Sequence, residues 1–315
     1  MQYICNMKYT VEHSSPLLKY LYEIMPDQSR TSVKKYLEDR RIQVNGEITG
    51  AFDLPLRHGD VINIVPKGIA ITESVRIGAR EEAESKGVRI IYEDEWIIII
   101  DKKAGVPTIR QSTKEGDTAY SILTSYVKAK AGAERHHLKI YGKGPARVFI
   151  VHRIDMGTSG LLLFAKDERT KDLLQSKWNS MVLERKYKAV VEGCIVPPDG
   201  TVESWLTENE KSFKMSSSPF DDGGEHAVSH YRTIVPGKKY SAVEFELETG
   251  RKNQIRVHCQ VLGHPIAGDR KYGASSNPIR RLALHAATLV FRHPQTNEVM
   301  RFTSPVPKEF DSIIR

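Results

Sequence analysis

The chain has 315 residues and a formal net charge of +8, with 40% hydrophobic and 27% charged residues. This size and composition indicate an ordinary globular protein of two domains and exclude a wholly disordered chain. Its three cysteines form no C-x-x-C pair and its longest apolar run, WIIII, cannot span a bilayer, so we expect a cytoplasmic protein without zinc site, disulfide framework, signal peptide or membrane anchor.

The first 65 residues predict a small α/β domain. A stripe of leucines that ends before Pro26 predicts one helix, and apolar residues at positions 33, 36 and 37 predict a second. The stretch RIQVNGEI then alternates apolar and polar residues and turns at Asn45-Gly46, a strong hairpin signal. The stretch HGDVINIV supplies a further strand.

Basic side chains cluster on and just after the second of these helices: Arg30, Lys34, Lys35, Arg40 and Arg41. Most charge runs of this kind are solvated helix faces. Here few acidic residues accompany them, and a one-sided basic helix beside a hairpin suits contacts with RNA phosphates. The stretch SRTSVKKYLEDRRIQVNG resembles the small RNA-binding module with an alpha-L motif first known from a small-subunit ribosomal protein. The resemblance implies RNA binding by residues 1–65, through Arg30, Lys34, Lys35 and Arg41.

Residues 66–87 are polar and predict a linker. From residue 88 to residue 315, long strands are mixed with occasional helices, which favours an α+β domain with a mixed, largely antiparallel sheet. The stretch DTAYSILTSYVKAK predicts a helix capped by Asp117, and residues 132–147 predict a basic loop. The stretches DERTKDLLQSKWNS and RKNQIRVHCQVLG predict two more helices.

The stretch VHRIDMGTSG, residues 151–160, places Asp155 after His152 and Arg153 and before two glycines. The glycines permit close backbone approach or a positive φ, and the hydroxyl of Thr158 can donate to a carboxylate. Two interpretations stand side by side: an aspartate that caps a turn, and a carboxylate kept ionised by a cation so that it acts as nucleophile or base.

A second basic cluster, ETGRKNQIRVHCQVLGHPIAGDRKYG, spans residues 248–273. A metal site is the obvious alternative for this region, with four candidate ligands: His258, His264, Asp269 and His285. Their spacing matches no familiar ligand pattern, and the neighbouring arginines would repel a cation. No phosphate-binding G-x-x-x-x-G-K-S/T motif occurs either. We therefore expect neither a metal nor a cofactor.

Several stretches together resemble one family. VHRIDMGTSGLLLFAK closely resembles the motif around the catalytic aspartate of the RluA-type RNA pseudouridine synthases. Further family motifs follow in the family's order, and together they cover residues 88–304: IIYEDEWIIIIDKKAGVPT, ERKYKAVVEG, TGRKNQIRVHCQVLGHPIAGDRKYG and LALHAATLVFRHP. The resemblance implies an isomerase that flips a uridine out of its RNA and converts it to pseudouridine without a cofactor. The N-terminal module favours large-subunit ribosomal RNA as the substrate.

Carried over by position, Asp155 corresponds to the catalytic aspartate, Tyr187 to the tyrosine against the target base, and Arg256 to the arginine that pairs with the aspartate. Arg153 corresponds to a residue that holds the target nucleotide out of the RNA stack. The remaining residues of the expected substrate-binding set are His152 and Thr158. Three positions depart from the family's pattern and bear on substrate preference: Lys103, Ile154 and Asn253.

Three alternatives remain beside this prediction. The enzyme could act on transfer RNA, or the chain could be a catalytically silent RNA-binding factor in ribosome assembly. A glycosidase would need a second carboxylate near Asp155, for which Glu184 and Asp269 are the candidates. RNA is the expected partner in the first two cases, no membrane partner is expected, and the sequence predicts no oligomeric state.

Overall fold

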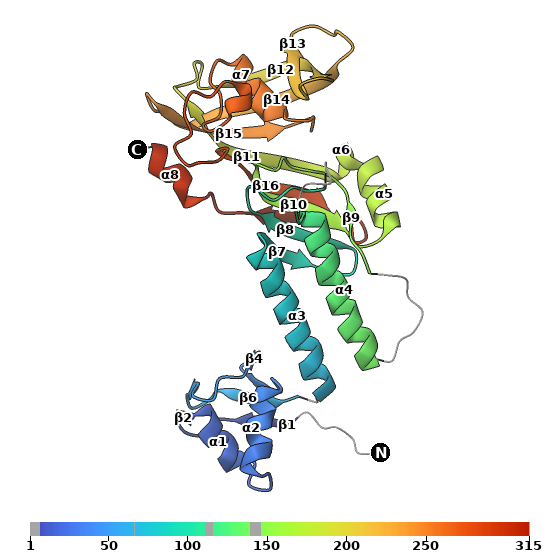
Figure 1. Ribbon diagram of the computed structural model, residues 1–315, viewed down its shortest axis with the longest axis vertical. Helices are drawn as coiled ribbons and strands as arrows, with labels where there is room; N and C mark the ends of the chain where they lie inside the picture. The colour runs from blue at the N-terminus through green and yellow to red at the C-terminus, as the bar shows by residue number, and fades with distance from the viewer. Residues whose placement is uncertain (1–6, 66, 111–115, 139–145, 315) are drawn as a thin grey trace. The chain divides into compact units, whose positions relative to one another are not determined.

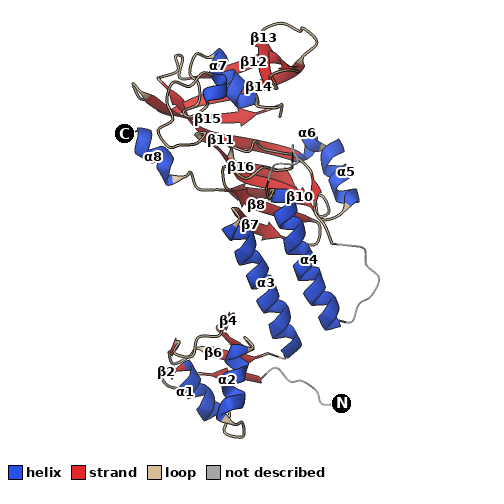
Figure 2. Ribbon diagram, viewed as in Figure 1, coloured by secondary structure: helices blue, strands red, loops and turns tan. Residues whose placement is uncertain are grey.

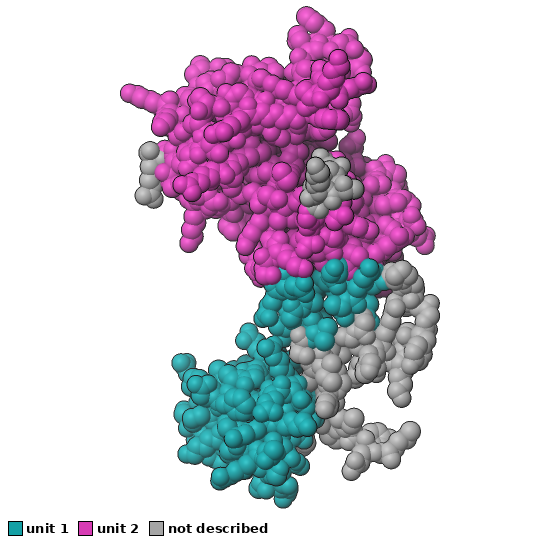
Figure 3. All heavy atoms as spheres, in the orientation of Figure 1, with its two compact units in different colours: residues 1–82, 125–146 teal, residues 83–124, 147–315 magenta. Residues whose placement is uncertain are grey.

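The computed structural model describes residues 7–65, 67–110, 116–138 and 146–314. The chain divides into two compact units, which Figure 3 shows in teal and magenta. Unit 1 comprises residues 1–82 and 125–146, and unit 2 comprises residues 83–124 and 147–315. Among the described residues, no helix is long and apolar enough to cross a membrane.

Unit 1 contains a four-stranded antiparallel sheet in the order β1-β6-β3-β4, with two short helices (Figures 1 and 2). The strands of unit 1 are β1 (Met7–Thr10), β2 (Ser15–Pro16), β3 (Ile42–Val44), β4 (Glu47–Thr49), β5 (Pro55–Leu56) and β6 (Val61–Ile64). The helices are α1 (Leu17–Ile24) and α2 (Arg30–Glu38). The predicted hairpin is confirmed: β3 and β4 pair across Asn45 and Gly46, whose φ angles of 53° and 88° are those of a type I′ turn.

The predicted linker contains a helix, α3 (Lys67–Ser85), which the sequence analysis did not anticipate. Its sequence is rich in alanine, glutamate and arginine, which favour helix, but it carries no apolar stripe of the kind that reveals a helix. The boundary between the two units falls inside this helix, at residues 82 and 83.

The helix predicted from residue 117 is also longer than expected. Helix α4 spans Ala119–Leu138, so the first part of the predicted basic loop is helical, and residues 139–145 lie outside the described residues. Thr118, rather than Asp117, caps it: the backbone N–H of Ser121 donates to the Thr118 hydroxyl and the N–H of Thr118 donates to the Ser121 hydroxyl.

Unit 2 is built on an eleven-stranded sheet that follows the order β13-β12-β14-β15-β11-β16-β10-β8-β7, with β9 paired to β10 and β17 to β16. Its strands are β7 (Val88–Glu93), β8 (Ile97–Lys102), β9 (Phe149–Ile150), β10 (Ser159–Ala165), β11 (Val182–Glu192), β12 (Asp199–Asn209), β13 (Lys214–Ser218), β14 (Glu225–Val235), β15 (Tyr240–Leu247), β16 (Leu284–Arg292) and β17 (Val299–Thr303). Every neighbouring pair is antiparallel except β10 and β16. This confirms the predicted α+β class with a mixed, largely antiparallel sheet.

The remaining helices of unit 2 are α5 (Glu168–Ser176), α6 (Trp178–Met181), α7 (Gln254–Val261), α8 (Lys308–Ile314) and the 3-10 turn η1 (Arg270–Tyr272). In Figure 1 helix α7 lies beside β13 and β14, whereas α5 lies beside β9 and β10 and α6 beside β11. The apolar side of α7, Ile255 and Cys259, packs into the core on β11 and β15. Gln254, Val257 and His258 are buried on the other sides of this helix, and Arg256 extends from it toward Asp155.

Gly160 sets the start of β10, directly after the Asp155 turn. Its φ is 112°, and a Cβ atom at this position would lie 2.2 Å from the carbonyl oxygen of Ala286 on the parallel strand β16. Only glycine fits both the dihedral angle and this close approach. The glycine-rich turn that the sequence placed after Asp155 therefore brings the two central strands together beside the aspartate.

Candidate active site

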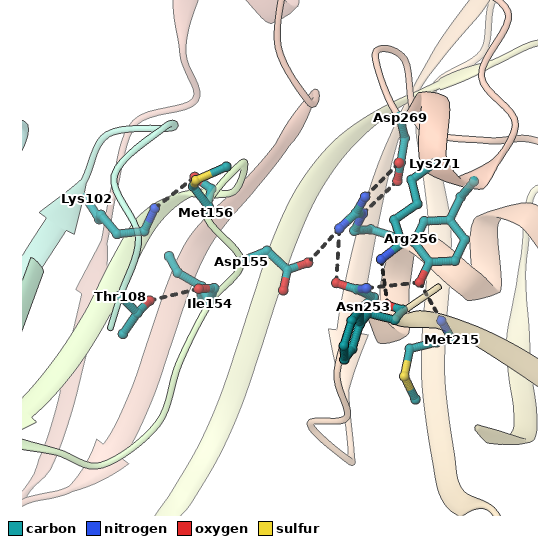
Figure 4. Close-up of polar contacts among 12 residues, drawn as sticks. Lys102, Thr108, Ile154, Asp155, Met156, Met215, Asn253, Arg256, Asp269 and Lys271 are labelled. Carbon is teal, nitrogen blue, oxygen red and sulfur yellow. Dashed lines mark hydrogen bonds and ion pairs between the residues drawn. The ribbon is translucent and has the colours of Figure 1, made fainter. Parts of the chain in front are cut away.

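The loop that carries Asp155 connects β9 to β10 and is tied down on both sides of the aspartate. The hydroxyl of Thr108 donates to the carbonyl of Ile154 (2.8 Å), and the backbone N–H of Gly105 donates to the carbonyl of Met156 (2.8 Å). Figure 4 shows Asp155 projecting away from these contacts. The backbone on either side of the carboxylate is thus fixed before any substrate binds.

Lys102, the last residue of β8, is fully buried under the same loop. Its Nζ lies within hydrogen-bonding distance of four backbone carbonyls: those of Thr158 and Val106 (2.7 Å each), Lys103 (3.1 Å) and Met156 (3.3 Å). Burial lowers the pKa of Lys102 to about 7, against the opposing effect of the Asp155 charge. The sequence analysis did not single out this lysine, although its place at the end of a strand that opens with four isoleucines, Ile97 to Ile100, was a signal that it lies near the core.

Arg256 reaches Asp155 from helix α7. Its Nη1 lies 3.3 Å from Asp155 Oδ2, while Nε and Nη2 donate to the two carboxylate oxygens of Asp269 at 2.7 and 2.8 Å (Figure 4). The Asp269 side chain is only 1% exposed. Burial alone would lower the pKa of Arg256, but its bonds with Asp269, helped by Asp155, raise that pKa above its ordinary value. The guanidinium is therefore permanently charged and clamped in one orientation.

Asn253 completes the clamp. Its φ of 55° lies in the left-handed region, which asparagine tolerates better than most residues, and it stands just before α7. Its Oδ1 accepts from Arg256 Nη1 (3.0 Å) and its Nδ2 donates to the hydroxyl of Tyr272 (2.9 Å). The Arg256 guanidinium lies 4.8 Å from the centroid of the Tyr272 ring. Asn253, a departure from the family's pattern, thus has a structural part in this site.

Two cavities meet at Asp155. The smaller, of about 60 Å³, is lined by Tyr187, Thr158 and the first residues of α7, and the larger, of about 390 Å³, by Lys252, Lys271 and Phe213. The lining residues common to both include Asp155, Arg153 and Arg256. The Asp155 side chain is 21% exposed, so its carboxylate is accessible from the cavities while Arg256 holds it.

Tyr187 lies on β11, where a bulge between Lys186 and Tyr187 interrupts the pairing with β16. Bulges of this kind re-aim a side chain, and the Tyr187 ring lines the smaller cavity. Burial raises the pKa of Tyr187 above its ordinary value, and the negative charge of Asp155 adds to the shift. The hydroxyl is therefore protonated near neutral pH.

Asp155, Tyr187 and Arg256 all lie in a part of the chain that matches a known protein family. A sequence model of the RNA pseudouridylate synthase family matches residues 96–261. The chain is 32% identical over 305 residues to the uncharacterized RNA pseudouridine synthase YlyB of Bacillus subtilis, covering 96% of this chain and 94% of the relative.

The chain belongs to the RluA-type RNA pseudouridine synthase family. It is also 29% identical over 309 residues to the ribosomal large subunit pseudouridine synthase D of Pasteurella multocida, covering 93% of this chain and 88% of that protein. Human RNA pseudouridylate synthase domain containing 4 shares the fold, with a TM-score of 0.54 and 22% identity over 76% of this chain and 95% of the human one. The enzyme is accordingly an RNA uridine-to-pseudouridine isomerase.

His152 does not join the site of this pseudouridine synthase. Its Nε2 accepts the backbone N–H of Leu163 (3.0 Å), and its ring lies 4.8 Å from that of Trp178. Burial, together with the nearby Arg185 charge, lowers the pKa of His152 to about 3, so it is neutral. The structure gives no support to the expectation that it binds substrate, because His152 lines neither cavity at Asp155 and instead ties the loop to β10.

The other two expected substrate-binding residues of this loop do line the cavities. Arg153 is exposed and lines both, and Thr158 is buried and lines the smaller one. The backbone N–H of Thr158 donates to the carbonyl of Asp155 (3.1 Å), which closes the turn. The two interpretations of this turn are therefore compatible, because the aspartate sits in a closed turn and also presents its side chain.

The residues named for a metal site have protein partners instead. His264 Nδ1 lies 2.8 Å from the carbonyl oxygen of Glu192, and His285 Nδ1 lies 2.9 Å from the Ser159 hydroxyl. Within the described ranges, no three His, Cys, Asp or Glu residues converge on one point. For the glycosidase alternative, Glu184 pairs with Lys186 (2.7 Å) and with Arg301, and Asp269 is taken by Arg256.

His258, fully buried on α7, makes the stability of unit 2 sensitive to acid. It lies between the hydroxyls of Ser229 (2.9 Å) and Ser204 (3.2 Å), and burial lowers its pKa to about 4. Between pH 6.5 and 4 the unfolded chain binds a proton at this histidine that the folded chain does not, so stability falls as pH falls through this window. The full effect is about 3 kcal/mol.

We expect urea unfolding, followed by tryptophan fluorescence, to show this loss between pH 7 and pH 4.5. The variant His258→Gln removes the titrating group and reduces the loss by about 2 kcal/mol. His230→Gln, on the surface beside Glu248, is the matched control and keeps the wild-type pH dependence. An unchanged pH dependence in His258→Gln would contradict the assignment.

The basic residues of unit 1 divide into two kinds. Arg30, Lys34 and Lys35 are exposed on α2. Arg41 is partly engaged within the unit, because its guanidinium lies 4.2 Å from the ring centroid of Tyr36 and its Nε donates to the carbonyl of Val65 (3.0 Å). The Arg30 guanidinium also lies near a ring, 5.5 Å from the centroid of Tyr22, so Lys34 and Lys35 are the freer candidates for phosphate contacts.

Proposed function

We propose that this enzyme isomerises one or a few uridines of large-subunit ribosomal RNA, with Asp155 as the attacking group. The observation that carries the proposal is the clamped Asp155 carboxylate at the meeting point of two cavities, one of them lined by Tyr187. Ribosomal RNA is supported by the relatives whose names specify the large ribosomal subunit.

The reaction exchanges one bond for another. The bond between ribose C1′ and base N1 breaks, the base turns, and a bond forms between C1′ and C5. The proton on C5 leaves and N1 gains a proton, so atoms and charge balance. The Asp155 carboxylate adds to the nucleotide at the start and is expelled when the new bond has formed. No redox change occurs, so the reaction needs no electron carrier.

Each remaining residue of the site has a part in this scheme. The target uridine must leave its stack to reach Asp155. The protonated Tyr187 provides an aromatic face against which the flipped base can lie. Arg153, which is exposed and lines both cavities, provides a cation that can contact the RNA strand at the position from which the base has turned out. Arg256 holds the Asp155 carboxylate in place, which is the positioning that such an attack requires.

Residues 1–65 act in this proposal as the RNA-binding domain, residues 66–87 as a connection that is largely helical, and residues 88–315 as the catalytic domain. The basic side chains of α2 then contact the phosphates of the RNA backbone, and these contacts do not depend on the base sequence.

The double variant Lys34→Gln/Lys35→Gln tests these contacts. If each lysine contacts one phosphate, the slope of log affinity against log salt concentration falls by about 1.5. Affinity for a long RNA transcript is measured by filter binding between about 50 and 200 mM salt. The control variant Lys8→Gln/Lys19→Gln removes two exposed lysines that belong to β1 and α1 instead of α2. An unchanged slope for the α2 variant would mean that α2 does not bind phosphate.

The substrate is tested with unmodified transcripts labelled with tritium at uridine C5. Formation of pseudouridine releases that hydrogen to water, so tritium release counts turnovers. We expect release from a large-subunit ribosomal transcript and none from a pool of transfer RNA transcripts. Release from the transfer RNA pool alone would overturn the ribosomal substrate but keep the chemistry. No release from either, with binding intact, would favour the silent RNA-binding alternative.

A further inference from the structure

Phe213 is an unusual residue at the tip of the hairpin that joins β12 to β13. Its φ is 50°, in the left-handed region, where glycine or asparagine is the ordinary choice and a side chain with an aromatic ring is disfavoured. The side chain is also 63% exposed, so the folded chain gains little from burying it. Neither the backbone nor the core explains a phenylalanine here, and strained residues of this kind concentrate at functional sites.

The tip is anchored firmly, so the strain does not reflect a loose loop. The Phe213 backbone N–H donates to the carbonyl of Asn209 (2.8 Å), and Lys271 Nζ donates to the Phe213 carbonyl (2.6 Å). The N–H of Met215, two residues on, donates to the hydroxyl of Tyr272 (3.0 Å). Tyr272 is the ring beneath Arg256, and Figure 4 shows Met215 and Lys271 on the Arg256 side of the site.

These anchors hold the ring at the wall of the larger cavity, the one that Asp155 also lines. Cations surround it: Lys252 Nζ lies 6.0 Å from the ring centroid, and Lys271 and Arg153 line the same cavity. Lys252 is paired with Glu208. An exposed aromatic face among cations is the arrangement with which proteins bind single-stranded nucleic acid, by stacking a base and contacting the neighbouring phosphates.

We propose that Phe213 stacks on an unpaired RNA base next to the target uridine, while Lys252 and Lys271 contact the phosphates on either side of that base. This proposal rests on the proposed function, because it assumes that the target uridine binds at Asp155 and that the RNA strand beside this uridine occupies the larger cavity. The ring binds the neighbouring base and takes no part in bond making. Its loss therefore weakens capture of the RNA more than it slows the chemical step.

The test measures tritium release from the C5-labelled ribosomal transcript over a range of RNA concentrations. Phe213→Ala and Phe213→Leu are each expected to raise KM about tenfold, because the loss of one base–aromatic stack weakens RNA binding by about that factor. We expect kcat to stay within about threefold of wild type. Phe213→Trp, which keeps an aromatic face, retains KM within about twofold. The control is Phe220→Ala, which removes a ring that is 77% exposed and lines neither cavity at Asp155.

A wild-type KM in Phe213→Ala, or an equal rise in Phe220→Ala, would overturn the proposal and leave the proposed function standing. If the wild-type enzyme itself released no tritium, the proposed function would fail first. The two failures are therefore distinct.

Phe213→Gly separates a strained binding residue from a structural one. Glycine relieves the left-handed backbone, so the thermal unfolding midpoint of unit 2, followed by tryptophan fluorescence, should rise by about 2 °C. KM for the RNA should rise in the same variant as it does in Phe213→Ala. A lower midpoint would show that the ring supports the fold and would contradict the argument from strain.

Discussion

Replacing Asp155 by asparagine is expected to reduce pseudouridine formation by at least about 10⁴-fold, the effect of removing a nucleophile, while RNA affinity stays within about threefold of wild type. The amide has nearly the same shape and can still contact Arg256, so the loop pinned by Thr108 and Lys102 should keep its structure. It cannot, however, add to the nucleotide as a carboxylate does. The defect therefore lies in kcat rather than in binding.

Tritium release and filter binding on the same labelled transcript separate the two quantities. Asp172→Asn, on the exposed surface of α5, is the matched control and should retain full activity. Turnover by Asp155→Asn at the wild-type rate would remove Asp155 from the mechanism, whatever its place in the two cavities.

The second large effect is expected from Asp269→Asn. Asp269 is almost wholly buried and makes a two-point ion pair with Arg256, so the change leaves a buried guanidinium without its main counterion. Breaking such a pair from one side costs about 3 kcal/mol of folding free energy. Arg256 also loses its fixed orientation toward Asp155. We therefore expect kcat to fall by about 100-fold, which is the usual cost of a small displacement of a reacting group.

Urea unfolding followed by tryptophan fluorescence measures the first effect in unit 2, which contains all three tryptophans of the chain. Glu208→Gln removes the carboxylate of the more exposed Lys252 pair and should cost less than about 1 kcal/mol. If Asp269→Asn were as stable as Glu208→Gln, the account of the Arg256 clamp would be wrong.

Much of this site could be predicted because its backbone demands are local. The closed turn at Asp155 depends on a hydrogen bond between residues three positions apart, and together with the glycines that follow it appears as a compact motif. The close approach of Gly160 to Ala286, by contrast, is visible only in the fold. The sheet class followed from strands long enough to show their apolar pattern. Asp155, Tyr187 and Arg256 were predicted from the family resemblance, and their catalytic roles stay predictions here.

What the sequence could not show depends on partners far apart in the chain. Asp269 was considered as a metal ligand or a second acid, and only the fold reveals that Arg256 occupies both of its oxygens. His152 lies three positions before Asp155 in the same loop, yet its contacts are with Leu163 and Trp178, and it lines neither cavity.

Helix α3 and the tip of the β12–β13 hairpin were missed for related reasons. The helix has no apolar stripe that a pattern search can detect. The conformation of Phe213 depends on Lys271, 58 positions later in the chain. Local propensity would have placed a glycine or an asparagine at this turn.

The central claim is tested most directly by mapping pseudouridine across total RNA from cells with the gene, without it, and without it but carrying Asp155→Asn. The account predicts that one or a few pseudouridines disappear from large-subunit ribosomal RNA without the gene. They should return with the wild-type gene and stay absent with Asp155→Asn. Retention of every ribosomal pseudouridine in cells without the gene would contradict the proposed substrate, and restoration by Asp155→Asn would contradict the proposed mechanism.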